Sequence, residues 1–192
     1  MIKILMNGCN GKMGQTITRL IQEYNDISII AGVTRNPSKL QNRYPVYQSF
    51  KEVEADEVDV VLDFSNPEML TDAIEYCIEH QAALVIGTTG LSDKDNENLR
   101  QASASIPVFV SANMSYGISV LLDLALKAAS ALGSEYNIEI LEKHHNEKKD
   151  APSGTAIMIA KELKSHIDDS MELVYDRSKS KEKRKPNEIG LA

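Results

Sequence analysis

Cysteine, tryptophan and long apolar runs are scarce in this chain of 192 residues, which contains two cysteines and no tryptophan. Two cysteines are too few for a disulfide framework, and Cys9 and Cys77 fit no metal-binding spacing. We therefore expect no metal centre and a reducing, cytoplasmic environment. No uninterrupted apolar run approaches the roughly 20 residues of a membrane span, and the N-terminal residues do not form a signal peptide.

Acidic residues outnumber basic ones, 28 to 21, so the formal net charge is −7. This balance argues against general nucleic-acid binding, which requires a basic surface. One local exception is residues 177–185, where basic side chains cluster. We interpret this segment as a solvated loop. The alternative is that its positive potential attracts an anionic ligand near a site.

Short apolar segments alternate with amphipathic segments as far as residue 110. Continuous apolar strands separated by helices are typical of a parallel sheet covered on both faces, so we predict an α/β, Rossmann-like fold. The expected strands are Ile2–Asn7, Ser28–Thr34, Val58–Asp63, Ala83–Ile86 and Pro107–Val110, and the expected helices are Lys12–Tyr24, Pro67–His80 and Ser92–Ser103.

The pattern changes after Ser111. We predict a long helix over Gly117–Leu132, a strand over Asn137–His144 and an amphipathic helix from about Ser153 to His166. A helix packed on a half-exposed sheet is typical of an α+β architecture. We therefore divide the chain into a first domain of residues 1–114 and a second domain of residues 115–192.

Three glycines in the spacing Gly-x-x-Gly-x-x-Gly follow the first expected strand and open a helix. In a dinucleotide site Gly8 would permit the tight turn, Gly11 would let the backbone approach a pyrophosphate, and Gly14 would let the helix pack on the strand. The phosphates would lie at the helix N-terminus, where N–H groups favour anions. A plain strand–helix turn is the alternative, but the position after an N-terminal apolar strand favours nucleotide binding.

The end of the second expected strand bears on the choice of cofactor. NAD-selective sites place Asp or Glu there, whereas this chain has Thr34 followed by Arg35. Arg35, alone or with Lys12, could pair with a 2′-phosphate, or it is simply a solvated loop residue. We predict NADPH, with NADH as the alternative. The loops Gly87–Gly90 and Ser111–Met114 are expected at other strand ends, near the nicotinamide half.

A second cluster of chemically useful residues begins with adjacent histidines, His144 and His145. Histidine titrates near neutral pH and is the commonest general acid or base, while Lys148 adds a positive charge and a proton donor. A solvated or metal-scavenging histidine pair is the alternative, but no further ligands at zinc-site spacing follow.

A helix start follows this histidine pair. Ser153 and Thr155 offer hydroxyls, and Gly154 removes a side chain that would block approach, so backbone N–H groups and the helix dipole favour an anion. A routine N-cap without a ligand is the alternative. Together with the nucleotide motif, the histidine pair and this helix start predict a reductase for a small acidic substrate.

These segments together resemble the dihydrodipicolinate reductase family over essentially the whole chain. The resemblance implies a cytoplasmic NAD(P)H-dependent enzyme that reduces 4-hydroxy-tetrahydrodipicolinate in lysine and diaminopimelate biosynthesis, typically as a homotetramer assembled through its C-terminal sheet. Its most specific part is the Glu-x-His-His-x-x-Lys-x-Asp-Ala-Pro-Ser-Gly-Thr-Ala string. The matching strings are Gly8–Gly14, Asp63–Ser65 followed by Pro67, Ile86–Gly90, Ala112–Ser115 and Glu142–Ala156.

The resemblance also implies roles for individual residues. His144 would be the general acid/base, and Lys148 a proton donor that also contacts a substrate carboxylate. The implied substrate-binding residues are His145, Ser153, Gly154 and Thr155. The implied nucleotide contacts are Gly8, Cys9, Asn10, Gly11, Lys12, Met13, Gly87, Thr88, Thr89, Ser111, Ala112, Asn113 and Met114, with Arg35 at the position that discriminates between cofactors.

The residues at 188–192 are typical of the opening of another strand, and members of the family continue for several dozen residues beyond this point. We therefore expect an incomplete second domain with residues after Glu172 loosely held, which puts tetramer formation and activity in doubt. The alternative function is a non-catalytic nucleotide-binding fragment of such a reductase.

Overall fold

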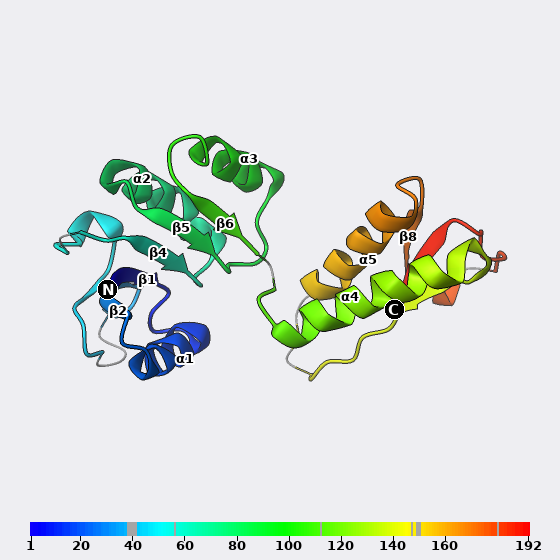
Figure 1. The fold of residues 1–192 in the computed structure, drawn as a ribbon, viewed down its shortest axis with the longest axis horizontal. Helices are drawn as coiled ribbons and strands as arrows, with labels where there is room; N and C mark the ends of the chain where they lie inside the picture. Colours follow the sequence, from blue (N-terminus) through cyan, green and yellow to red (C-terminus); the bar gives the residue numbers. More distant parts are fainter. Residues whose placement is uncertain (38–41, 56, 112, 147, 149–150, 180) are drawn as a thin grey trace. The chain divides into compact units, whose positions relative to one another are not determined.

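The computed structural model describes the whole chain except residues 38–41, 56, 112, 147, 149–150 and 180. The chain folds into two compact units, Met1–Ala112 and Asn113–Ala192 (Figure 1).

The first unit is built on a six-stranded parallel sheet with the order β3-β2-β1-β4-β5-β6. The predicted Rossmann-like sheet is therefore confirmed. Its shortest strand, β3, was not predicted, because two residues are too few to show a pattern. The strands are β1 (Ile2–Asn7), β2 (Ile27–Val33), β3 (Val46–Tyr47), β4 (Val60–Asp63), β5 (Ala83–Ile86) and β6 (Val108–Val110).

Helices cover both faces of this sheet (Figure 1). Along the sheet, the step from β1 to β2 runs in one direction and the steps from β4 to β6 run in the opposite direction. Right-handed crossovers therefore place α1 on one face of the sheet and α2 and α3 on the other face. Strand residues such as Leu5, Val61 and Leu84 are completely buried between these layers. The helices are α1 (Lys12–Leu20), α2 (Leu70–His80) and α3 (Asp93–Ala102), and the 3-10 turns are Ile21–Glu23, Phe50–Glu52 and Pro67–Met69.

The second unit is a three-stranded parallel sheet packed against two helices, with the strand order β7-β9-β8. Its core joins Ala160 and Leu163 of the second helix to Ile189 and Leu191 of the central strand. The helices are α4 (Tyr116–Leu132) and α5 (Gly154–Ile167), the strands are β7 (Ile138–Ile140), β8 (Glu172–Tyr175) and β9 (Glu188–Leu191), and the 3-10 turns are Gly133–Glu135 and Arg177–Lys179.

The expectation that residues after Glu172 are loosely held is wrong for β9. This strand pairs with β7 on one side and β8 on the other, and the side chains of Ile189 and Leu191 are buried. Strand β8 was not predicted at all. Because β8 pairs in parallel with β9, the small sheet has three strands rather than the two expected from the sequence.

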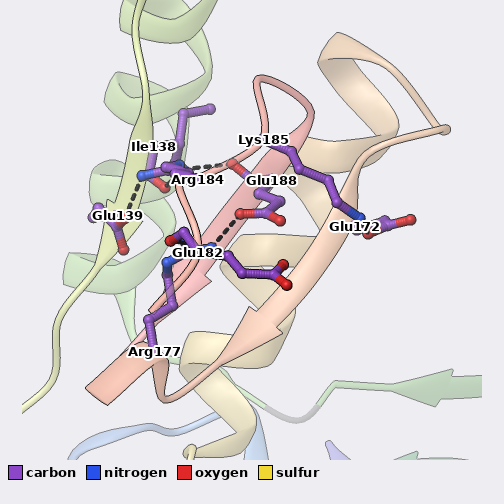
Figure 2. Close-up of polar contacts among 8 residues, drawn as sticks. All are labelled: Ile138, Glu139, Glu172, Arg177, Glu182, Arg184, Lys185 and Glu188. Atoms are coloured by element: carbon purple, nitrogen blue, oxygen red, sulfur yellow. Dashed lines mark hydrogen bonds and ion pairs between the residues drawn. The ribbon is translucent and has the colours of Figure 1, made fainter. Parts of the chain in front are cut away.

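The basic segment predicted to be a solvated loop forms most of the connection between β8 and β9. We call residues 176–187 the β8–β9 strap. Each strand of the small sheet presents one carboxylate to it. The ion pairs are Arg184 with Glu139 of β7, Arg177 with Glu188 of β9, and Lys185 with Glu172 of β8 at 3.7 Å (Figure 2).

The strap therefore binds the sheet face opposite the helices. Ile138 and Ile140 pack in the core with the helices, so Glu139 between them points the other way. Arg184 also donates to the carbonyl oxygens of Ile138 and Glu188, and its side chain is 16% exposed. The interpretation as a solvated loop is thus wrong for this arginine, because its charge is already matched within the unit.

Helix α4 is more apolar than the sequence argument allowed. With the following turn it spans Tyr116–Glu135 at a mean hydropathy of 1.4, which is long and apolar enough to cross a membrane by length and composition. Counting uninterrupted runs missed it because Asp123 and Lys127, which form an ion pair at 2.6 Å, break the run. The core helix of a soluble protein passes the same test but is mostly buried, whereas none of this segment is buried. Leu122 packs against the core of this unit, and Leu124 is exposed.

Candidate active site

A cavity of about 300 Å³ lies at the carboxyl ends of β1, β2 and β4 in the first unit. The strand order reverses between β1 and β4, which is the position where open parallel sheets bind ligands. Four predicted cofactor residues meet here, together with residues of the β4–α2 connection to which the sequence assigned no role. The lining residues are Asn7, Gly8, Asn10, Gly11, Thr34, Arg35, Asn36, Phe64, Ser65, Asn66 and Met69.

The turn after β1 and the helix that follows it each require a glycine at one position. Gly8 has a φ of +81°, and a Cβ there would lie 2.5 Å from the carbonyl oxygen of Phe64. A Cβ on Gly14 would lie 2.3 Å from the carbonyl oxygen of Gly8, so any side chain would push α1 away from the turn. Gly11 caps α1 without a side-chain hydrogen bond. The first N–H groups of α1 therefore suit an anionic ligand.

The carboxylate of Asp63 ties three strand ends together behind this pocket. It is completely buried. Its Oδ1 accepts hydrogen bonds from the Ser65 N–H at 2.8 Å, the Ser65 hydroxyl at 2.6 Å and the Thr88 hydroxyl at 2.8 Å, while its Oδ2 accepts from the Asn7 amide at 3.1 Å. These partners follow or end β1, β4 and β5. Thr88, predicted as a nucleotide contact, thus directs its hydroxyl to Asp63.

Arg35 lines the pocket as predicted, but it has a partner that the sequence did not reveal. Its guanidinium binds the Glu68 carboxylate at 2.9 Å, and both side chains are largely exposed. Glu68 lies in the turn after β4, 33 residues further along the chain. An anion at this position would therefore compete with Glu68 for Arg35.

Cys9, Lys12 and Met13, the other predicted nucleotide residues of this segment, do not line the cavity. Cys9 is buried, and burial raises the pKa of its thiol to about 11. Its carbonyl oxygen accepts a hydrogen bond from the side chain of Gln15 at 2.8 Å. Lys12 and Met13 are exposed on the first turn of α1.

Two predicted loops follow β5 and β6. The N–H of Gly87 donates to the carbonyl oxygen of Asp63 at 2.8 Å, and Thr89 is exposed. The N–H of Ser111 donates to the carbonyl oxygen of Ile86 at 3.0 Å. Ala112 lies outside the described residues. Asn113 and Met114 belong to the second unit, where Asn113 accepts a hydrogen bond from the Ser115 N–H ahead of α4.

The second cluster of predicted residues begins beyond a strand. Because β7 ends at Ile140, the predicted strand Asn137–His144 is too long. The two histidines lie beyond the strand, so their side chains do not have to point to opposite faces of a sheet. The Nε2 atom of His144 lies 3.0 Å from Oε2 of Glu142. His145 is exposed, and its carbonyl oxygen accepts from the N–H of Lys148 at 3.2 Å.

Glu142 also binds the start of α5. Ser153 is the N-cap residue, and its hydroxyl oxygen accepts from the N–H of Ala156 at 3.1 Å. Its own N–H and hydroxyl both donate to Glu142, at 2.6 and 2.5 Å. Burial alone would raise the pKa of Glu142, but hydrogen bonds from Ser153 and His144 outweigh it and lower that pKa. Glu142 is therefore a carboxylate at neutral pH.

The first turn of α5 carries the other two predicted substrate residues. Gly154 is exposed and Thr155 is half-buried. Within the described part of the chain, no three His, Cys, Asp or Glu side chains gather as a metal ion would require. The cluster offers the cation of Lys148, the imidazole of His144 and the N-terminus of α5. These groups suit a carboxylate ligand and proton transfer.

Comparison with known proteins assigns both halves of the chain to one family. The family model described as dihydrodipicolinate reductase, N-terminus, matches residues 2–114, and the model described as its C-terminus matches residues 117–192. The chain belongs to the dihydrodipicolinate reductase family. It is thus an NAD(P)H-dependent oxidoreductase whose first unit is the Rossmann-like, cofactor-binding part.

Curated relatives in this family align along the whole chain. The 4-hydroxy-tetrahydrodipicolinate reductases of Caldanaerobacter subterraneus subsp. tengcongensis and Clostridium tetani are 46% and 42% identical over 191 residues, and the chain spans 74% of the length of each. A dipicolinate-bound dihydrodipicolinate reductase from Paenisporosarcina sp. TG-14 has the same fold. Its TM-score is 0.73 at 23% identity, and the alignment covers 100% of this chain and 79% of that one.

Proposed function

We propose that the chain reduces 4-hydroxy-tetrahydrodipicolinate to tetrahydrodipicolinate, a step of lysine and diaminopimelate biosynthesis. The supporting observation is that the two family models match the two units in turn, and each unit carries a site suited to its half of the reaction. The names of the curated relatives support this substrate.

The residues of the first unit fit a dinucleotide. Gly8, Asn10 and Gly11 would hold the pyrophosphate at the N-terminus of α1, where the turn excludes side chains and N–H groups favour anions. Arg35 would face the adenosine ribose, at the end of β2. When bound, NAD(P)H supplies the hydride.

The residues of the second unit fit the substrate. Gly154 and Thr155 at the start of α5 would bind one substrate carboxylate, with His145 and the charge of Lys148 beside them. Overall the substrate loses one water and gains one hydride and one proton. His144 and Lys148 are the side chains that we propose to hold and transfer that proton.

Loss of either group should slow turnover of freshly generated substrate, measured as NADPH oxidation. We expect His144→Gln and Lys148→Met to lower kcat by about 10²–10⁴-fold, the usual contribution of general acid–base groups. NADPH affinity should stay nearly unchanged, because its pocket lies in the first unit. His80→Gln and the neighbouring Lys143→Met are matched controls that should keep full turnover.

Two outcomes would contradict these assignments. Full turnover in a His144 or Lys148 variant would remove that residue from the mechanism. NADPH binding without any substrate-dependent oxidation by the unaltered chain would instead favour the alternative function, a non-catalytic nucleotide-binding fragment.

We also propose that NADPH binds at least as tightly as NADH. The carboxylate typical of NAD-selective sites is replaced by Thr34 and Arg35. Arg35→Ala should weaken NADPH selectively, whereas Arg43→Ala, outside the pocket, should leave both dissociation constants unchanged. Equal losses for the two cofactors in Arg35→Ala would show that Arg35 does not contact a 2′-phosphate.

We propose a cytoplasmic homotetramer assembled through the second unit, without nucleic-acid or membrane partners. The net charge of −7 and the exposed apolar side chains of Leu121, Leu124 and Leu132 on α4 support self-association rather than nucleic-acid binding. Analytical ultracentrifugation tests the assembly, and a monomer at micromolar concentration would contradict it.

A further inference from the structure

Glu142 connects two residues of the second cluster that the sequence treated separately. One of its oxygens, Oε2, accepts from both Nε2 of His144 and the hydroxyl of Ser153, while Oε1 accepts from the N–H of Ser153. Its side chain is 17% exposed, against 37% for His144. A well-shielded carboxylate thus joins an imidazole to the first turn of α5.

This contact determines which nitrogen of His144 carries a proton. A carboxylate can only accept hydrogen bonds, so Nε2 must be protonated whenever the 3.0 Å contact is made. In the neutral ring the second nitrogen, Nδ1, then holds the lone pair. Nδ1 is therefore the atom that can take up a proton, or lose one when the ring is doubly protonated.

We propose that Glu142 is the positioning residue of this site: it fixes His144 through Nε2 so that Nδ1 exchanges the proton with the substrate. The proposal rests on the proposed function, in which His144 is the acid. In that step the Nδ1–H bond breaks, the proton moves to the substrate, and the electron pair stays on Nδ1. The neutral ring that remains keeps its Nε2–H on Glu142.

The contacts with Glu142 also change the role that we assign to Ser153, which the sequence predicted to bind the substrate. Both donors of this residue are directed to Glu142, and its hydroxyl oxygen accepts from Ala156. We therefore assign Ser153 to holding Glu142 against α5, and leave the substrate carboxylate to Gly154 and Thr155. The helix that binds the substrate and the imidazole that protonates it are thereby joined rigidly through one side chain.

The first test is the Nε2 proton itself, observed by NMR of protein labelled with ¹⁵N-histidine. The His144 signals are assigned by their loss in His144→Gln. At a pH where the ring is neutral, we expect an Nε2-bound proton protected from exchange with water, and its loss from the spectrum in Glu142→Ala. An Nδ1-protonated ring in the unaltered protein, or an Nε2–H signal that survives in Glu142→Ala, would overturn the proposal.

The second test is kinetic. Glu142→Ala and Glu142→Gln should lower kcat by about 10- to 100-fold, less than the 10²–10⁴-fold expected for the acid itself. Glutamine replaces one of the two acceptor oxygens by an amide donor, so it loses at least one of the three contacts that Glu142 makes. Glu142→Asp keeps both acceptors and should recover part of kcat. The substrate KM should change by less than about threefold, because the proposed carboxylate-binding groups remain.

The variant Leu163→Ala distinguishes a purely structural role of Glu142 from the proposed positioning role. Leu163 is buried in α5, so this variant destabilises the same helix through a cavity and alters no polar group. An equal loss of kcat in Leu163→Ala and Glu142→Gln would overturn the proposal. If Glu142→Ala does not fold, Glu142→Gln carries the kinetic test, and the NMR test rests on the unaltered protein, where an Nδ1-protonated ring overturns the proposal. Full turnover in His144→Gln would refute the proposed acid, whereas the NMR result would still decide the Glu142 contact.

Discussion

The two units bury their sheets in different ways. In the first unit, helices cover both faces of the sheet, and strand residues such as Leu5 and Val61 lose all contact with solvent. In the second, helices cover one face, and the β8–β9 strap covers the other through ion pairs to Glu139, Glu188 and Glu172. Hydrophobic pattern alone therefore predicts the first architecture, while one face of the second sheet is covered through ion pairs that this pattern does not show.

The sites differ in the same sense. The cofactor pocket is built around the backbone of the glycine turn, where Gly8 leaves no room for a side chain, and residues at the ends of β1, β2 and β4 complete its lining. The second site depends on side chains, with Glu142 holding His144 and Ser153. A motif of glycines can reveal the first kind of site. The second kind appears only when the loop after β7 and the start of α5 meet in space.

The largest effect should follow loss of Asp63, the polar centre of the first unit. Asp63→Ala removes the acceptor of the buried Thr88 hydroxyl and one acceptor each of the Asn7 amide, the Ser65 N–H and the Ser65 hydroxyl, which should cost about 3 kcal/mol of unfolding free energy. NADPH binding should weaken with it. Denaturant melts of the full chain measure the loss, which we expect in the first unit's transition.

An exposed aspartate in the same unit provides the control. Asp59 accepts from the backbone N–H of Lys3 at 2.7 Å, and Asp59→Ala should cost less than about 1 kcal/mol. Similar losses in the two variants would show that the buried network contributes little beyond an ordinary hydrogen bond. A loss confined to the second unit's transition would contradict the assignment of this network to the stability of the first unit.

The next effect should follow loss of Arg177 from the strap. Glu188 is 7% exposed, so Arg177→Ala leaves a buried carboxylate without its partner. We expect the second unit to lose about 2 kcal/mol, below the range for fully buried pairs because Arg177 is itself partly exposed. Lys185→Ala, at a long and exposed pair, should cost less than about 0.5 kcal/mol. Equal losses would mean that the strap acts only by covering the sheet.

The contrast between the units matches what the sequence could predict. The strands Ile2–Asn7 and Ala83–Ile86 were predicted to the residue, because each is an apolar run bounded by turn residues. Strand β8 was missed because its four residues show no clear alternation, and β7 was drawn too long because Leu141 looks like a core residue but is exposed.

The sites divide in a similar way. The sequence located Gly8, Gly11 and Arg35 at one pocket because strand ends and glycine spacing are local signals. It could not show that Glu68 pairs with Arg35, because that contact joins two separate strand ends. A carboxylate next to a histidine pair was visible in the motif, but nothing local indicated that Glu142 binds Ser153.

Thiol labelling should report on the first unit alone, since Cys9 and Cys77 both lie there. Burial raises their pKa values to about 11 and about 12, so at pH 8 both are shielded, protonated thiols that react slowly with Ellman's reagent. Asp63→Ala should speed labelling by on the order of 100-fold if opening is at equilibrium, because each 1.4 kcal/mol is a factor of ten. Arg177→Ala should leave the rate unchanged, and acceleration there would show that the units open together.

The smallest effect concerns Glu68, whose carboxylate forms the exposed ion pair with Arg35. Glu68→Gln keeps the size of the side chain and the backbone N–H bond to Asn66, but it removes the charge that competes with a 2′-phosphate. Exposed ion pairs contribute about 0–1 kcal/mol, so NADPH should bind about two- to fivefold more tightly while NADH is unchanged. Glu79→Gln on α2 controls for the change in net charge. Calorimetry at fixed ionic strength measures both cofactors. Because the gain requires the guanidinium, Glu68→Gln should have no effect in an Arg35→Ala background, and an equal gain for NADH would show a general charge effect instead.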